Sequence, residues 1–147
     1  MSEKIEEAFE LLKRGDYDKA FEILLPIAED GDADAQFYIG IIYQERAGDE
    51  PEYSDDDEFF SNMERDDNLD AAAKMFKSAA DQGLTEAKFA FARICLTNAI
   101  HPDIAADPFT LYKHDDVIPY LESAVIDGHK DAKLLLDHVI EFKKKNS

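Results

Sequence analysis

The chain has no tryptophan and one cysteine, Cys95, among 147 residues, so an intramolecular disulfide is excluded. Glycine and proline are also few, at six and five. The longest strongly apolar stretch lies near residues 37–43, far short of the roughly 20 residues that a membrane-spanning helix needs. Residues 1–4 are not an apolar leader, so no signal peptide is predicted. We therefore expect a soluble, cytoplasmic protein.

Basic residues are scarce. The chain has 16 lysines and arginines against 34 acids, for a formal charge of −18. Phosphate groups would be repelled by this field, which argues against binding to nucleic acid or to an anionic membrane. A basic protein partner would instead be attracted, and its encounter accelerated. The alternative is that the charge serves only to keep the chain soluble.

Motifs of catalysis are absent from the sequence. There is no phosphate-binding glycine loop, no dinucleotide fingerprint and no serine nucleophile elbow. The four histidines are scattered and none belongs to a zinc-binding motif: His101, His114, His129 and His138. We therefore predict a protein that is not an enzyme and uses no metal or cofactor.

Three aspartates, Asp30, Asp32 and Asp34, match the spacing of the first ligands of a calcium loop. The match then fails, because Ala35 stands where the loop needs glycine and Ile41 where it needs glutamate. Helix capping explains these aspartates better, with Asp32 or Asp34 as the cap.

The stretch 25–43 is the most informative one. Gly31 follows an apolar-periodic run, and glycine at that place ends a helix because it adopts a left-handed backbone without a Cβ clash. Beyond it, Ala35, Ile39 and Ile42 recur at helical spacing. The stretch therefore predicts a helix, a tight turn and a second helix.

This pattern recurs twice. Gly31 aligns with Gly83 at an offset of 52 residues, and Gly83 with Gly128 at an offset of 45. Small and apolar positions follow the same offsets, including Ala35, Ala87 and Ala132. Helix pairs that recur in this way are typical of an α/α solenoid, in which stacking covers the apolar face of each pair. We predict an all-α superhelix forming a single domain over 1–147, with three repeats at about 16–46, 68–98 and 114–144.

The predicted helices end at glycines and prolines. Gly15 ends the first, Asp16 caps the second, and Asn68 or Asp67 caps the fourth; Pro26 should kink the second. Two insertions, an acidic one at 47–67 and another at 99–113, interrupt the repeats. The seven helices are expected at 3–14, 17–30, 33–46, 68–82, 85–98, 114–127 and 131–144.

Residues 24–40, LLPIAEDGDADAQFYIG, resemble the Sel-one-like repeat family, relatives of the tetratricopeptide repeats, whose typical run is LLPLAEQGDAEAQYNLG. Residues 81–94 are similar, with Ala92 in place of the second glycine, and 127–140 keep Gly128 and Ala132. The resemblance covers about 16–140. It implies non-enzymatic protein–protein binding, often in bacteria, with the first helix of each repeat on the concave side.

Our first hypothesis is a bacterial immunity protein or antitoxin that neutralises a basic toxin such as a nuclease. The alternatives are a generic cytosolic adaptor and, remotely, a hydrolase. Between 49 and 58, seven of ten residues are acidic. Variable positions of the concave helices would supply the other contacts, although Tyr38 has the alternative role of helix packing. The expected partner-binding residues are Asp49, Glu50, Glu52, Asp55, Asp56, Asp57, Glu58, Tyr38, Gln44, Glu45, Arg93 and Thr97.

Overall fold

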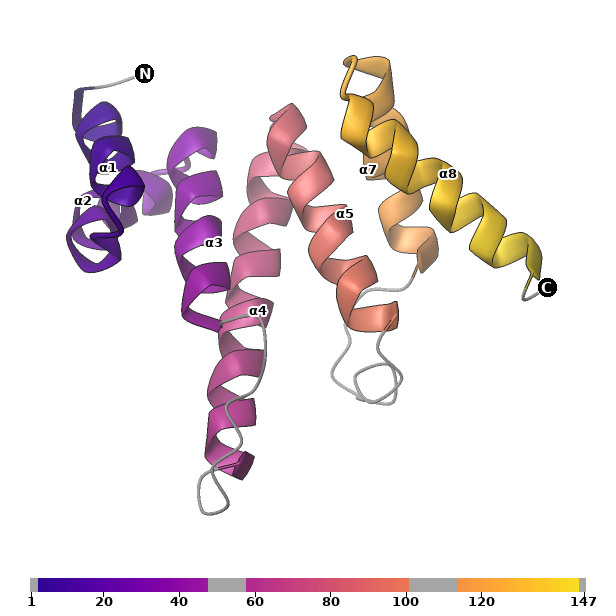
Figure 1. Ribbon diagram of the computed structural model, residues 1–147. Helices are drawn as coiled ribbons and strands as arrows, with labels where there is room; N and C mark the ends of the chain where they lie inside the picture. The colour runs from indigo at the N-terminus through magenta and orange to yellow at the C-terminus, as the bar shows by residue number, and fades with distance from the viewer. Residues whose placement is uncertain (1–2, 48–57, 101–113, 146–147) are drawn as a thin grey trace. The chain divides into compact units, whose positions relative to one another are not determined.

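The computed structural model describes residues 3–47, 58–100 and 114–145, and the side chains of 3–47, 67–96, 117–141 and 144. All three ranges are helical apart from short turns, without a strand among them, so the predicted all-α fold is confirmed (Figure 1). None of the described helices is long and apolar enough to cross a membrane. The helices are α1 Glu3–Lys13, α2 Tyr17–Glu29, α3 Ala33–Ala47, α4 Glu58–Asp81, α5 Thr85–Ile100, α7 His114–Ile126 and α8 Lys130–Lys145.

A glycine of positive φ joins the helices of each tight pair. Gly31 has φ of 103°; its amide donates to the Ala28 carbonyl at 3.0 Å, and the next amide, of Asp32, donates to the Ile27 carbonyl at 3.3 Å. This two-bond arrangement satisfies carbonyls that the end of α2 leaves open. Gly83 and Gly128 have φ of 101° and 93°, so the recurring turn is confirmed, and Gly15 adds a fourth at 80°.

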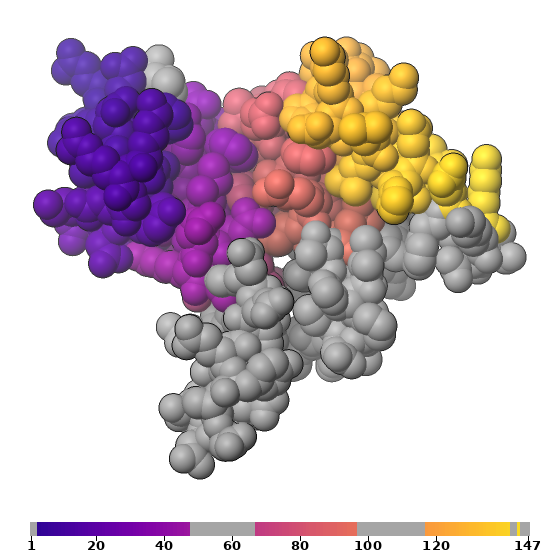
Figure 2. All heavy atoms as spheres, in the orientation of Figure 1, coloured from indigo at the N-terminus to yellow at the C-terminus, as the bar shows by residue number. Residues whose placement is uncertain are grey.

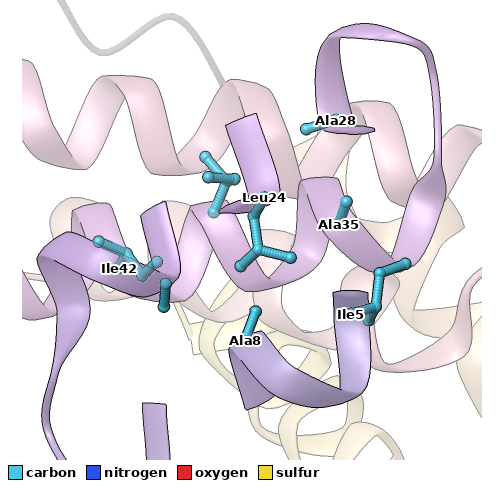
Figure 3. Packing of buried hydrophobic residues seen from close by; sticks show 8 residues of the cluster. Ile5, Ala8, Leu24, Ala28, Ala35 and Ile42 are labelled. Atoms are coloured by element: carbon cyan, nitrogen blue, oxygen red, sulfur yellow. The ribbon is translucent and has the colours of Figure 1, made fainter. Parts of the chain in front are cut away.

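Contacts divide the chain into two compact units, which we call the N-terminal unit, Met1–Ala79, and the C-terminal unit, Ala80–Ser147. In the N-terminal unit α1 packs on α2 and α2 on α3. On the face shown in Figure 2 their atoms form one continuous body. Figure 3 shows their shared core, in which alanines at the contacts let the helices approach closely. Its buried members are Ile5, Ala8, Ala20, Leu24, Ala28, Ala35, Ile39 and Ile42.

Two contacts fix α3 further. The buried side chain of Gln36 donates from Nε2 to the Ala28 carbonyl at 3.2 Å, which ties the start of α3 to the end of α2. On the side towards α4, Gly40 faces the ring of Phe76, and a Cβ at Gly40 would lie 2.5 Å from Cε1 of that ring. Position 40 therefore needs glycine for close packing.

In the C-terminal unit α5 packs on α7, and α7 on α8. One set of positions that the repeat offsets make equivalent is buried in all three copies: Ala35, Ala87 and Ala132 each have no exposed surface. Cys95, which aligns with Tyr43 at the offset of 52 residues, is a buried thiol. The core of this unit includes Ala80, Ala87, Phe91, Val117, Leu121, Ala124, Ala132 and Val139.

Helix α4 corrects two predictions. It begins at Glu58, so 58–67 of the expected acidic insertion are helical, and Asp67 and Asn68 lie inside the helix instead of capping it. The breakers Gly48 and Pro51 lie before Glu58, and no glycine or proline occurs between Glu58 and Asp81 to interrupt a helix. Helix α5 likewise extends two residues past its expected end, up to Ile100, and the next breaker is Pro102.

Besides Asp67 and Asn68, one further expected cap differs in the structure. Asp16 precedes α2 as predicted but, among the described residues, its side chain makes no capping hydrogen bond. Its carboxylate lies 3.7 Å from the ammonium of Lys19 instead. Asp32 does cap α3, accepting from the Ala35 amide at 2.9 Å. Helix α2 continues through Pro26, as its expected range of 17–30 requires.

A valine at Gly31 should destabilise the N-terminal unit by about 1–2 kcal/mol, because a β-branched residue is strained at positive φ. Thermal unfolding followed by circular dichroism measures the effect. Gly31→Asn is the control, since asparagine tolerates this conformation. Equal stability of the two variants would contradict the role assigned to this turn.

Candidate interaction surface

The expected partner-binding residues fall into three groups, according to how much of each the structure describes. Asp49, Glu50, Glu52, Asp55, Asp56 and Asp57 lie outside the described residues. Glu58 begins α4 and Thr97 lies in α5, but their side chains lie outside the described ones. Tyr38, Gln44 and Glu45 lie on α3, and Arg93 lies on α5. The structure thus brings three of the expected residues together on one helix.

One side of α3 is partly open to solvent. The residues on this open side recur every three or four positions along α3, so they share one face of the helix. Ala35, Ile39 and Ile42, on the other side, are buried. Tyr38 and Gln44 are half-buried on the open side, and Glu45 is exposed. We call this open side the α3 face; it comprises Asp34, Phe37, Tyr38, Ile41, Gln44 and Glu45.

Aromatic rings connect the α3 face to its neighbours. The ring centroid of Tyr38 lies 5.6 Å from that of Phe9 on α1 and 5.6 Å from that of Phe37. Phe37 lies in turn 5.7 Å from Phe76 on α4. Tilted ring contacts at such distances stabilise beyond the area they bury. The packing role weighed for Tyr38 is therefore real, and it holds the ring in a fixed position on a partly open surface.

Two other rings of this unit carry cations. The ammonium of Lys13 lies 4.5 Å from the ring centroid of Phe9, and the guanidinium of Arg46 lies 4.6 Å from that of Phe21. Each cation also meets a carboxylate, Lys13 that of Glu10 at 3.3 Å and Arg46 that of Asp18 at 3.1 Å. Each of these two cations of the chain thus lies against a ring and an acid together.

Tyr38 lies in a negative field. Burial raises the pKa of its phenol above the ordinary value of 10.0, and the charge of Asp34 raises it further. Both effects favour the neutral phenol over the phenolate. Asp34 is one helical turn before Tyr38, so a carboxylate and a ring lie beside each other on the α3 face.

Charge is divided unequally along the chain. Residues 1–79 hold 23 acids and 8 bases, whereas residues 80–147 hold 11 acids and 8 bases. The first 79 residues therefore carry −15 of the total −18. A cationic polypeptide would be drawn to this part of the chain.

Arg93 belongs to a stack in the C-terminal unit. Its guanidinium lies 5.6 Å from the ring centroid of Phe89, and Phe89 stacks on the imidazole of His129 at 4.6 Å. Nε2 of His129 lies 3.3 Å from the carboxylate of Glu86, and Nδ1 accepts from the Ala132 amide at 3.0 Å. These partners assign the proton to Nε2. His129 thus caps α8, a role that the sequence did not predict.

Lys88 forms a polar cluster between α5 and α7. Its ammonium donates to the Ser123 hydroxyl at 2.8 Å and to the Asp127 carboxylate at 2.9 Å. The hydroxyl of Thr85 donates to the same carboxylate at 2.8 Å. Hydrogen bonds from Lys88 and then Thr85 lower the pKa of Asp127 below its ordinary value. Because Lys88 is engaged within the unit, we assign this cluster to helix packing.

Among the side chains that the structure describes, three large apolar ones are exposed, and all three lie in the C-terminal unit: Ile126 is 85% exposed, Leu134 70% and Ile140 40%. The sequence did not indicate this, although the repeat offers a signal. Leu134 aligns with Phe89 and Phe37, which are both half-buried under another ring. The same position is uncovered in the third copy.

Across the described residues, no group of three histidine, cysteine, aspartate or glutamate side chains could hold a metal ion. Cys95 is buried in the core of the C-terminal unit. The α3 face combines half-buried rings with acids, a chemistry that suits contact with a cationic polypeptide.

Fold and surface together define an all-α protein built from repeated helix pairs. No protein-family model, curated protein or solved structure matches the chain. The resemblance to the Sel-one-like repeats therefore stays a prediction.

The Asp34→Asn variant should lower the pKa of Tyr38, because the amide removes the negative charge that opposes phenolate formation. Since burial is the larger cause, this pKa should still exceed 10.0. Carbon-13 NMR of the tyrosine ring, assigned with Tyr38→Phe, measures it. An unchanged pKa would show that Asp34 does not act on this ring. The control is Glu22→Gln on α2, which also removes one negative charge from the chain.

The Thr85→Val variant should raise the pKa of Asp127, because one of the two donors that stabilise the carboxylate is lost. The folded-state value lies below that of the unfolded chain. The contribution of Asp127 to stability is therefore present above the unfolded-state pKa and is lost as the pH falls through the folded-state pKa. NMR titration of the side-chain carboxyl measures the shift. Thr85→Ser keeps the hydroxyl and should match the wild type.

Proposed function

We propose that the chain is a non-enzymatic protein-binding module whose N-terminal unit captures a basic polypeptide. The observation that carries this proposal is the excess of 23 acids over 8 bases in residues 1–79, in the part of the chain that also contains the α3 face. Simple solubility would not require charge to be concentrated in this way. Rings held in place beside acids offer a contact surface once the partner has arrived.

Binding would take place in two stages. Long-range attraction first steers the cationic partner toward the N-terminal unit, which raises the association rate. The partner then buries the half-exposed rings of the α3 face, and this contact sets the lifetime of the complex. The acidic run 49–58 would meet basic side chains of the partner directly.

The concrete form that we favour is a bacterial immunity protein or antitoxin acting in the cytoplasm. A nuclease is a suitable target, because its substrate site is basic and carboxylates of the chain can take the places of substrate phosphates. The resemblance to Sel-one-like repeats supports a binding scaffold of this kind. Chain length of 147 residues is ample for such a one-to-one inhibitor.

An adaptor that joins two proteins is the second candidate. One observation favours it: the C-terminal unit exposes Ile126 and Leu134, and its charge is close to balanced. This chemistry differs from that of the α3 face, so it would suit a different partner. An adaptor should bind two proteins at once, whereas an inhibitor should block the activity of one.

Changing the seven acids of 49–58 to their amides should slow association with the captured partner about ten-fold at low salt and flatten its salt dependence. The partner is first isolated from the source cell by affinity capture and mass spectrometry, at low and at high salt. Association rates are then measured by surface plasmon resonance. A control variant carries amides at Asp131, Asp137 and Glu141 on α8.

Two results would contradict the proposal. The first is an association rate that does not change with salt in the wild type. The second is a captured partner that is acidic. A basic partner with an enzymatic activity that the chain blocks would support the inhibitor, and simultaneous binding of a second protein would support the adaptor.

A further inference from the structure

A recurring arrangement on the N-terminal unit combines an aromatic ring, a cation and a carboxylate. Phe9 has it with Lys13 and Glu10, all on α1. Phe21 has it with Arg46 from α3 and Asp18 from α2. The ring attracts the cation through its negative face, and the acid binds the N–H groups that point away from the ring. Two independent positions thus show how this surface holds a positive side chain.

Arg46 is the more informative of the two. Its guanidinium lies 4.6 Å from the ring centroid of Phe21 and donates from Nη2 to Asp18 Oδ1 at 3.1 Å. The ring of Phe21 also packs against that of Tyr43 in a T-shaped contact, with the ring centroids 5.6 Å apart. At this position a ring packed against a second ring, with an acid beside it, holds an arginine of the chain itself.

Tyr38 and Asp34 reproduce this arrangement without the cation. The ring is held by Phe9 and Phe37, both with centroids at 5.6 Å. Asp34 lies one turn earlier on the same helix, close enough for its charge to act on the phenol. Among the described residues, no base pairs with Asp34 and no cation lies over the ring of Tyr38. Both side chains are only half-buried, so solvent reaches them.

We propose that Tyr38 and Asp34 form a docking site for an arginine side chain of the basic partner. The incoming guanidinium stacks on the ring of Tyr38 and donates hydrogen bonds to the carboxylate of Asp34, as Arg46 does with Phe21 and Asp18. Charge complementarity with the first 79 residues, which carry −15, brings the cation to this surface. The inference rests on the proposed function and specifies which contact of the partner the α3 face recognises.

The site should prefer arginine to lysine. A guanidinium is planar, so it can lie flat on the ring while its edge donates to the carboxylate. An ammonium is a compact and strongly hydrated charge, so it gains less from the same pair. The ring is already fixed by its neighbours, which reduces the entropy lost when the arginine binds.

The test uses a fluorescently labelled hexa-arginine peptide and measures its affinity for the full chain by fluorescence anisotropy at low salt. Asp34→Asn should weaken binding about five-fold, and Tyr38→Leu by a similar factor. Tyr38→Phe keeps the ring and should bind like the wild type. Hexa-lysine should bind the wild type more weakly than hexa-arginine does. The two peptides should bind with equal affinity to Asp34→Asn, and likewise to Tyr38→Leu.

Glu22→Gln is the matched control, because it removes one acid from an exposed position of α2 and changes the overall field equally. If Asp34→Asn loses no more affinity than Glu22→Gln, the docking site is refuted while electrostatic capture stands. If the wild type does not bind hexa-arginine at all, both proposals fail. Circular dichroism and thermal unfolding are used to check that Tyr38→Leu is folded. Asp34→Asn tests the same site without removing a ring from the packing.

Discussion

The close approach of neighbouring helices is the constraint on which the rest depends. Alanines such as Ala35 and Ala87 stand at the helix contacts without any exposed surface, and Gly40 leaves room for the ring of Phe76. The chain can reverse within three residues because Gly31 and its counterparts adopt positive φ. Small residues at the contacts and sharp turns bring α3 against α1 and α4. This proximity brings four rings into one set of contacts, those of Phe9, Tyr38, Phe37 and Phe76.

Packing and electrostatics act together on the α3 face. Ring contacts hold Tyr38 between α1 and α4. Burial raises the pKa of its phenol, and the charge of Asp34 raises it further. The C-terminal unit has the same architecture but a different surface. There Lys88 is drawn into a cluster with Asp127, Phe89 is covered by His129, and Leu134 is exposed. One repeated scaffold therefore supports two surfaces of different chemistry.

Much of the fold was predictable because local signals and periodicity agree. Gly31, Gly83 and Gly128 mark turns, and the intervening apolar positions give the helices to within one or two residues at most ends. The start of α4 was misplaced by ten residues, since acidic composition suggested a loop although no helix breaker follows Pro51 until Gly83. Of the site, Tyr38 was predicted as one residue among several. Its contacts with Phe9 and Phe76, through Phe37, join helices far apart in sequence, and periodicity along one helix cannot reveal such contacts.

Cys95 has a practical consequence. It is the sole thiol of the chain and is only 7% exposed, in the middle of α5. An alkylating reagent can reach its sulfur only when this part of the core opens, because reaction requires an accessible thiolate. The rate at which this sulfur is alkylated therefore measures how often the core of the C-terminal unit opens locally, and no probe has to be introduced. Cys95 is thus a native reporter of local unfolding in this unit.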